Sequence, residues 1–366
     1  MSQPRQHHAT QHMKTHATQC HDSKTPSWEN AHEDGCRLSL AAISAYRGEL
    51  MGLAMLMIML FHVPLSSRDP FYGLHRMGNI GVDIFFFLSG VGLWFSWTKN
   101  PNYKHFFKRR YLRVYPAWLL MASLYYIPRF RGGDTMAWVD LVGDITINWD
   151  FWLHDELTFW YVPAAMALYL FAPAYMNLIK RDTTYRWLPV AMVVWCVAVQ
   201  WVAPIHNAVG HLEIFWSRVP IFFIGLGMGE SVRQKHSVPL SSAWLLLAVV
   251  LIGMGTSIYM EQNLHGKFPL FIERMVYIPV TVCGTWLLGT ALRRIGRGAR
   301  RALAFIGSIS LETYLIHAHF VLRRLPTDWS YWITFLACLA CTLPLAWALW
   351  LASSRLTGKI FKTKKK

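Results

Sequence analysis

The stretch RGELMGLAMLMIMLFH, residues 47–62, decides how the rest of the chain is interpreted. It is a run of apolar residues, most of them good helix formers, with an arginine at its first position and a histidine at its last. A helix needs about 20 residues to span the hydrocarbon core of a bilayer. Together with the apolar residues before it, this stretch predicts a membrane-spanning helix over residues 42–63.

Similar apolar segments follow along the chain of 366 residues, of which 54% are hydrophobic and only 15% charged. Soluble domains carry about 25% charged residues. The composition therefore excludes a soluble enzyme, a disordered chain and a disulfide-stapled secreted domain. It predicts an all-α fold, a polytopic transmembrane helix bundle of about ten spans. The predicted spans are 42–63, 80–98, 112–128, 158–177, 187–204, 214–231, 240–260, 270–292, 303–322 and 330–352.

The distribution of positive charge orients this bundle. With both termini cytoplasmic, 27 of the 36 Lys and Arg residues fall in predicted inner segments and nine in outer ones, as the positive-inside rule requires. The net charge of +16 thus reflects topology, and no nucleic-acid partner is expected. The predicted domains are a disordered cytosolic His-rich tail (1–40), the transmembrane domain (41–352) and a basic cytosolic tail (353–366).

Neither the histidines nor the cysteines predict a metal site. The histidines of residues 1–40 have no regular ligand spacing, so a metal-binding tract is the weaker interpretation of that segment. Cys338 and Cys341 are spaced as C-x-x-C but lie in an apolar span, where this spacing is typical of helix packing.

Arg47 and His62 bracket the first predicted span. At 100° and 1.5 Å per residue they lie about 60° apart around the helix and about 22 Å apart along it. A cation at the inner end and an imidazole near the outer end fit the two ends of one long substrate, and imidazole is suited to proton transfer near pH 7. The alternative is a histidine at the membrane interface bonded to a backbone carbonyl.

The second predicted span contains GVDIFFFLSG, residues 81–90, with Asp83 at its outer boundary and Ser89 near its middle. A carboxylate can fix the tautomer of a neighbouring imidazole, so Asp83 is a candidate to orient His62. It is equally a candidate to cap its own helix, and the sequence does not separate the two roles.

A basic segment, RYLRVYP at residues 110–116, follows on the predicted inner face. Arg110 and Arg113 are spaced i, i+3 and point the same way from a helix. Two guanidiniums here suit a phosphorylated cytosolic ligand. Anchoring to anionic lipid headgroups is the rival interpretation, and a second basic cluster at 293–301 has the same two interpretations.

The ninth predicted span carries Glu312 and, five residues later, His317. Ionisable residues inside a span are costly and mark candidate functional sites. A carboxylate near mid-membrane should be either paired or protonated. Outside the membrane, the longest outer loop (129–157) mixes six acidic residues with three tryptophans, which suits either sugar binding or an interfacial aromatic belt.

Taken together, these stretches resemble the acyltransferase-3 family of bacterial integral-membrane acyltransferases. The resemblance covers residues 43–350 and rests on the order of its motifs rather than on any single one. The motifs are LFH ending at His62, GVDIFFFLSG at 81–90, RYLRVYP at 110–116 and SISLETYLIH at 308–317, with weaker matches at 159–173 and 218–225.

The resemblance implies an O-acyltransferase of the bacterial plasma membrane, with acetyl-CoA or another acyl-CoA as co-substrate and no tightly bound cofactor. Its acceptor would be a hydroxyl of a surface glycan or of a lipid-linked sugar. In the family pattern an arginine precedes the histidine by eleven residues. Here that position holds Met51, and Arg47 lies one turn earlier on the same face.

On this interpretation His62 is the general base and Asp83 its orienting partner, while Arg47, Arg110 and Arg113 bind the CoA phosphates. Ser89, Glu312 and His317 are further intramembrane polar candidates. The rival class is a transporter or flippase for a glycolipid or small anion, in which intramembrane acids and histidines form a proton or substrate path. A sensor or scaffold without turnover is the third possibility. Release of free CoA from acetyl-CoA separates the enzyme from the other two.

Overall fold

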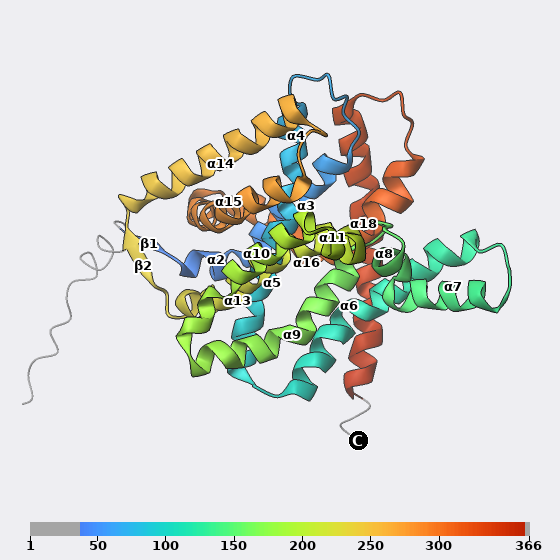
Figure 1. Ribbon diagram of the computed structural model, residues 1–366, viewed down its shortest axis with the longest axis horizontal. Coiled ribbons are helices and arrows are strands. Elements are labelled where there is room, and N and C mark those ends of the chain that lie inside the picture. Colours follow the sequence, from blue (N-terminus) through green and yellow to red (C-terminus); the bar gives the residue numbers. More distant parts are fainter. Residues whose placement is uncertain (1–36, 363–366) are drawn as a thin grey trace, which may run out of the picture. The chain divides into compact units, whose positions relative to one another are not determined.

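The computed structural model describes residues 37–362, and from residue 38 on the described chain forms one compact unit. The His-rich tail, Cys20 and Cys36 lie outside the described residues. Within them the fold is helical, apart from one pair of short strands, β1 (Arg37–Ser39) and β2 (Ser237–Pro239) (Figure 1). The predicted all-α class is therefore confirmed.

The longer helices correspond to the predicted spans. They are α3 (Arg47–His62), α5 (Ile80–Lys99), α6 (Tyr103–Tyr126), α9 (Tyr161–Arg181), α10 (Leu188–Trp201), α13 (Val219–Arg233), α14 (Ser242–Leu264), α15 (Leu270–Ala291), α16 (Arg297–Ser308) and α18 (Tyr331–Lys362). The shorter ones are α2 (Ala41–Ala45), α4 (Tyr72–Arg76), α7 (Thr135–Ile147), α8 (Trp149–Leu153), α11 (Ala203–Val209), α12 (Glu213–Trp216) and α17 (Ser310–Ile316). The predicted basic tail begins inside α18, which continues past residue 352 to Lys362.

Five of the described helices are long and apolar enough to cross a membrane, and the number rises to seven if two bent helix pairs each count as one span. The predicted spans at α3 and α13 fall short because these helices have only 16 and 15 residues, and α6 begins with a strongly basic segment. The chain therefore has several helices able to span a bilayer. The number ten and the orientation of the termini stay predictions.

Two predicted spans are broken, each for a local reason. The helix of the predicted span 187–204 ends at Trp201. After a bend of 93°, α11 begins at Ala203 with Pro204 as its second residue. The predicted span 303–322 is split at Ile309 into α16 and α17, with a bend of 63°. A break inside an apolar segment frees backbone carbonyls that need new partners. The break at Ile309 lies beside the candidate site described below.

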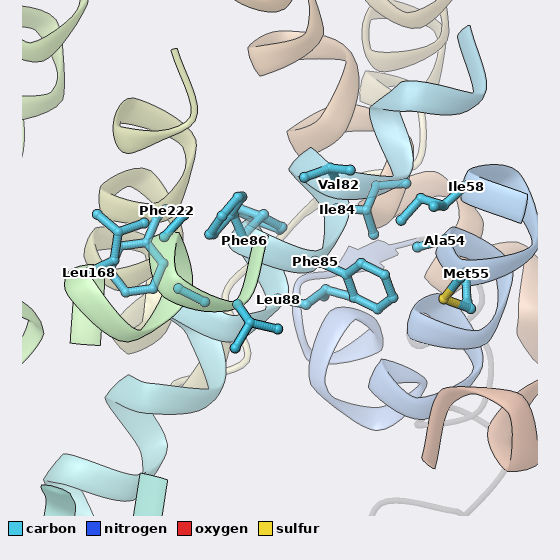
Figure 2. Packing of buried hydrophobic residues seen from close by; sticks show 14 of the residues in the cluster. Ala54, Met55, Ile58, Val82, Ile84, Phe85, Phe86, Leu88, Leu168 and Phe222 are labelled. Atoms are coloured by element: carbon cyan, nitrogen blue, oxygen red, sulfur yellow. The ribbon is translucent and has the colours of Figure 1, made fainter. Parts of the chain in front are cut away.

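The core is built around α5, whose sequence is apolar on every side and which is accordingly buried. Figure 2 shows Ile84 and Phe85 of α5 facing Ala54 and Ile58 of α3, with Phe86 toward the helices on the other side. On its opposite flank α3 packs against α16. Gly52 makes this possible, because a Cβ at this position would collide with the backbone carbonyl of Leu303.

The ends of α3 are fixed by local sequence. Tyr46 leaves the helical conformation between α2 and α3, so α3 begins at Arg47. Val63 is extended because it precedes Pro64, and a residue before proline disfavours the α conformation. His62 is therefore the last residue of the helix. The two residues singled out from the sequence stand at opposite ends of one central helix.

Candidate active site

The two ends of α3 open into two different cavities. Arg47 lines a cavity of about 440 Å³, which we call the arginine cavity. Its polar wall consists of Arg47, Ser89, Arg110, Arg113, Tyr161, Tyr169, Ser308, Ser310 and Tyr314. His62 lines a second cavity of about 290 Å³, the histidine cavity. Its polar wall consists of His62, Arg76, Asn79, Trp160, Arg274, Tyr314, His317 and His319. Tyr314 lines both cavities and is the one residue that their walls share.

Arg47 is held in the arginine cavity by α5. Its Nε donates a hydrogen bond to the carbonyl oxygen of Leu88 at 3.1 Å. The guanidinium lies against Gly92, where an added Cβ would come within 3.1 Å of Nε. The absence of a side chain at position 92 therefore leaves room for the guanidinium beside α5. The rest of the guanidinium is available to the cavity.

Arg110 and Arg113 reach the same cavity from α6, as their spacing predicts. Arg113 Nη2 donates to the carbonyl oxygen of Ser308 at 2.9 Å, which is one of the carbonyls freed where α16 ends. The guanidinium of Arg110 lies 5.8 Å from the ring centre of Phe106. The structure thus brings the three predicted phosphate-binding arginines and Ser89 into one wall. No acidic residue lines this cavity.

In the histidine cavity the structure pairs His62 with His317, which lies 255 residues away in the sequence. His317 is the first residue of a π-helical turn (His317–Val321), a feature often found at functional sites. Its Nδ1 donates to the carbonyl oxygens of Thr313 at 3.0 Å and Tyr314 at 2.9 Å. Carbonyl oxygens only accept hydrogen bonds, so Nδ1 carries the proton and Nε2 of the neutral ring is an acceptor.

That acceptor faces His62 Nδ1 at 3.3 Å. His62 Nδ1 also lies 2.8 Å from the carbonyl oxygen of Ile58, so it carries a proton that the two acceptors share. In the neutral ring of His62, Nε2 is then left with a free lone pair. A histidine in this tautomer can take a proton from a hydroxyl group. The carbonyl contact expected for an interfacial histidine is present too, and here it sets the tautomer.

Asp83 is engaged elsewhere. Its carboxylate pairs with Arg218 (Nε–Oδ2 3.3 Å), and both side chains are fully buried. Arg218 Nη2 also donates to Asn79 Oδ1 at 3.2 Å. Among the described residues, no hydrogen bond or ion pair joins Asp83 to His62, and no side chain caps the N-terminus of α5. Asp83 neutralises a buried arginine, which a charge in a low-dielectric interior requires.

The sequence analysis missed two arginines of the histidine cavity, Arg76 and Arg274. Each has a carboxylate behind it: Arg76 Nε lies 3.2 Å from Glu261, and Arg274 pairs with Glu213. Arg274 lies inside a predicted span. The rule that ionisable residues inside a span mark candidate functional sites, which singled out Glu312, would also have found Arg274. Phe159, on the same cavity wall, has a φ of 55°, which is uncommon for a residue with a side chain.

Glu312 lies on α17 and is fully buried. Neither of its carboxylate oxygens has a hydrogen-bond partner among residues 37–362. The sequence predicted that this carboxyl group is either paired or protonated, and no paired partner is found in the described part of the chain. Glu312 lines neither the arginine nor the histidine cavity.

Acidic residues of the outer loop 129–157 serve local structure. Asp134 caps α7 by accepting from the backbone N–H of Ala137 at 3.0 Å. Asp144 accepts from the backbone N–H of Asp150 at 2.9 Å, and its burial raises the pKa of this carboxyl group to about 6. Carboxylates engaged in this way are less free to bind a sugar, which weakens that interpretation of the loop.

A family profile described as an acyltransferase domain matches residues 50–351. The chain belongs to this acyltransferase-3 family, as its motifs indicate. The matched region contains His62, Asp83, Arg110 and His317, whereas Arg47 lies just before it.

A curated relative named acyltransferase MdmB, from Streptomyces mycarofaciens, is 28% identical over 284 residues. The alignment covers 66% of this chain and 67% of the relative. No solved structure matches the chain significantly.

Proposed function

We propose that the protein is an integral-membrane O-acyltransferase that transfers an acyl group, acetyl in the simplest case, from acyl-CoA to a hydroxyl group. The donor enters from the cytosol and the acceptor is a surface glycan or a lipid-linked sugar. The proposed location is the plasma membrane of a bacterium, crossed about ten times with both termini inside. The observation that carries the proposal is α3, which holds a cation in one cavity and an imidazole in the next.

The arginine cavity is proposed to bind the phosphates of CoA. Arg47, Arg110 and Arg113 supply guanidinium donors that match phosphate oxygens, and no carboxylate in the wall competes for them. The pantetheine arm then extends along α3, past Tyr314, and brings the thioester toward His62. The length of α3, about 22 Å between its first and last residues, suits an extended donor that reaches from one cavity to the other.

The histidine cavity is proposed to hold the acceptor. Nε2 of His62 takes the proton from the acceptor hydroxyl as its oxygen attacks the thioester carbonyl. The carbon–sulfur bond then breaks, and the same proton passes to the departing thiolate to give free CoA. His317 keeps the proton of His62 on Nδ1 and thereby keeps Nε2 available as the base.

The test is to incubate the purified protein with acetyl-CoA and a panel of glycans and lipid-linked sugars, and to measure free CoA and acetylated product. We expect release that requires both an acceptor and His62. The second candidate, a transporter, is favoured by the buried and unpaired Glu312. Movement of labelled glycolipid across vesicles without any release of CoA supports that candidate and rejects the enzyme.

A further inference from the structure

A second basic cavity adjoins the arginine cavity. It has a volume of about 480 Å³ and lies between α6 and α18, and we call it the α6–α18 cavity. It is lined by Arg109, Arg110, Arg113, Ser353, Ser354, Thr357 and Gly358. Arg110 and Arg113 also line the arginine cavity. The two cavities therefore share two guanidiniums, and Arg109 faces only the second one.

The two walls of the α6–α18 cavity are held together. Thr357 Oγ1 donates to the carbonyl oxygen of Leu112 on α6 at 3.2 Å and to that of Ser353 on its own helix at 2.8 Å. The bond to Leu112 ties α18 to the helix that carries the arginines. The cavity is thus formed by two joined helices rather than by a loose surface loop.

Its charge is unbalanced. Among the side chains that the structure describes, no acid lines it and no ion pair involves Arg109, Arg110 or Arg113. Glu312 interacts electrostatically with Arg113 but does not line this cavity. By contrast, both arginines of the histidine cavity have a carboxylate partner. Three arginines beside hydroxyl groups and without an acid favour a phosphate group, which presents several acceptor oxygens to guanidinium donors.

Acyl-CoA carries phosphate in two separate places: the pyrophosphate next to the pantetheine arm, and a monoester on the 3′ position of the ribose. The monoester carries close to two negative charges near pH 7, since its second pKa is about 6. The two cavities share Arg110 and Arg113 and so offer a separate place for each phosphate group.

We propose that the α6–α18 cavity binds the 3′-phosphate of CoA, with Arg109 as the residue that recognises it, while the pyrophosphate lies in the arginine cavity between Arg47 and the shared pair. This inference rests on the proposed function and adds a specificity to it: the protein distinguishes CoA from 3′-dephospho-CoA. The same chemistry could come from a lipid headgroup, so the test includes membranes of different charge.

The experiment measures the dissociation constants of CoA and 3′-dephospho-CoA for the full-length protein, once in neutral detergent and once in nanodiscs containing phosphatidylglycerol. We expect the wild type to bind CoA roughly ten- to a hundredfold more tightly, the range for hydrogen bonds to a charged group. Arg109→Gln should abolish this preference and leave the affinity for 3′-dephospho-CoA unchanged. Arg109→Lys, which keeps the charge but loses the planar fork, should recover part of it.

The matched control is Arg186→Gln, an exposed arginine after α9 that lines none of the three cavities described above, and it should change neither affinity. Equal binding of the two nucleotides by the wild type overturns the inference and leaves the proposed function standing. The inference is also overturned if Arg109→Gln lowers the affinity for both nucleotides equally. It is likewise overturned if the substitution changes the affinities only in the anionic nanodiscs, a result that points to a lipid headgroup as the ligand of Arg109. Binding of neither nucleotide rejects the proposed function itself.

Discussion

The arginine cavity and the histidine cavity lie at opposite ends of one helix but are built in opposite ways. In the arginine cavity the cations have no carboxylate partners and face an open space. In the histidine cavity each arginine has a carboxylate partner, and His62 and His317 are positioned by backbone carbonyls and by one another. The first is suited to binding a charged ligand, and the second to setting the protonation of one imidazole. We therefore propose that ligand binding and proton transfer take place at opposite ends of α3.

The largest effect is expected from removing the base. His62→Ala should lower kcat by roughly 10²–10⁴-fold, the usual contribution of general base catalysis, while KM for acetyl-CoA stays nearly constant. The measurement is steady-state release of CoA. His206→Ala, at an exposed histidine whose ring bonds only a backbone carbonyl, is the matched control. A variant at His62 that retains full turnover rules out the division of roles between the cavities.

The second largest effect concerns stability rather than rate. Asp83→Asn leaves Arg218 as a buried charge without its partner, and breaking such a pair costs about 3–5 kcal/mol. The midpoint of thermal unfolding in detergent should fall clearly, whereas Glu156→Gln, at an exposed carboxylate, should leave it unchanged. A variant that is as stable as the wild type but slow would instead assign Asp83 to the chemistry at His62.

A smaller effect is expected from His317, which acts through His62. His317→Ala removes the acceptor that faces His62 Nδ1. We expect a loss of roughly ten- to a hundredfold, the range found when hydrogen-bond partners of metal-bound histidines are removed. The change should appear in kcat and in its pH profile, with KM for acetyl-CoA unaffected. His317→Gln, whose amide oxygen can accept the same hydrogen bond, should restore part of the rate. If the pH profile of kcat is unchanged in His317→Ala, His317 contributes to packing and does not position His62.

The smallest effect should come from crowding Arg47. Gly92→Ala places a methyl group about 3.1 Å from the guanidinium, which the flexible arginine can partly avoid. We expect KM for acetyl-CoA to rise a few-fold with kcat unchanged, because uniform binding is lost and chemistry is not. A fall in kcat with constant KM would mean that the arginine end of α3 takes part in the reaction step.

The sequence predicted the three arginines of the arginine cavity, because the patterns that single them out are local, whereas the rest of its wall comes from distant helices. Helical periodicity puts Arg47 and His62 on one side of α3, and the i, i+3 spacing puts Arg110 and Arg113 side by side. The helical class followed from composition in the same way. These are rules that act within one element and need no knowledge of what packs against it.

The histidine cavity could not be predicted in this way, because it depends on contacts between distant parts of the chain. Nothing near Asp83 in the sequence indicates that Arg218 will neutralise it. The pairing of His62 with His317 depends on the break at Ile309 and on the π-helical turn that follows. Both pairs join residues that are far apart in the sequence, so rules that act within one helix do not reveal them.

The most direct test of the central claim is a structure of the protein with acetonyl-CoA, in which a ketone replaces the reactive thioester. The account predicts the nucleotide at Arg47, Arg110 and Arg113, the arm passing Tyr314, and the ketone carbon in front of His62 Nε2 with room for one acceptor hydroxyl. A ligand bound with its acyl end away from His62, or outside the two cavities at the ends of α3, would contradict it.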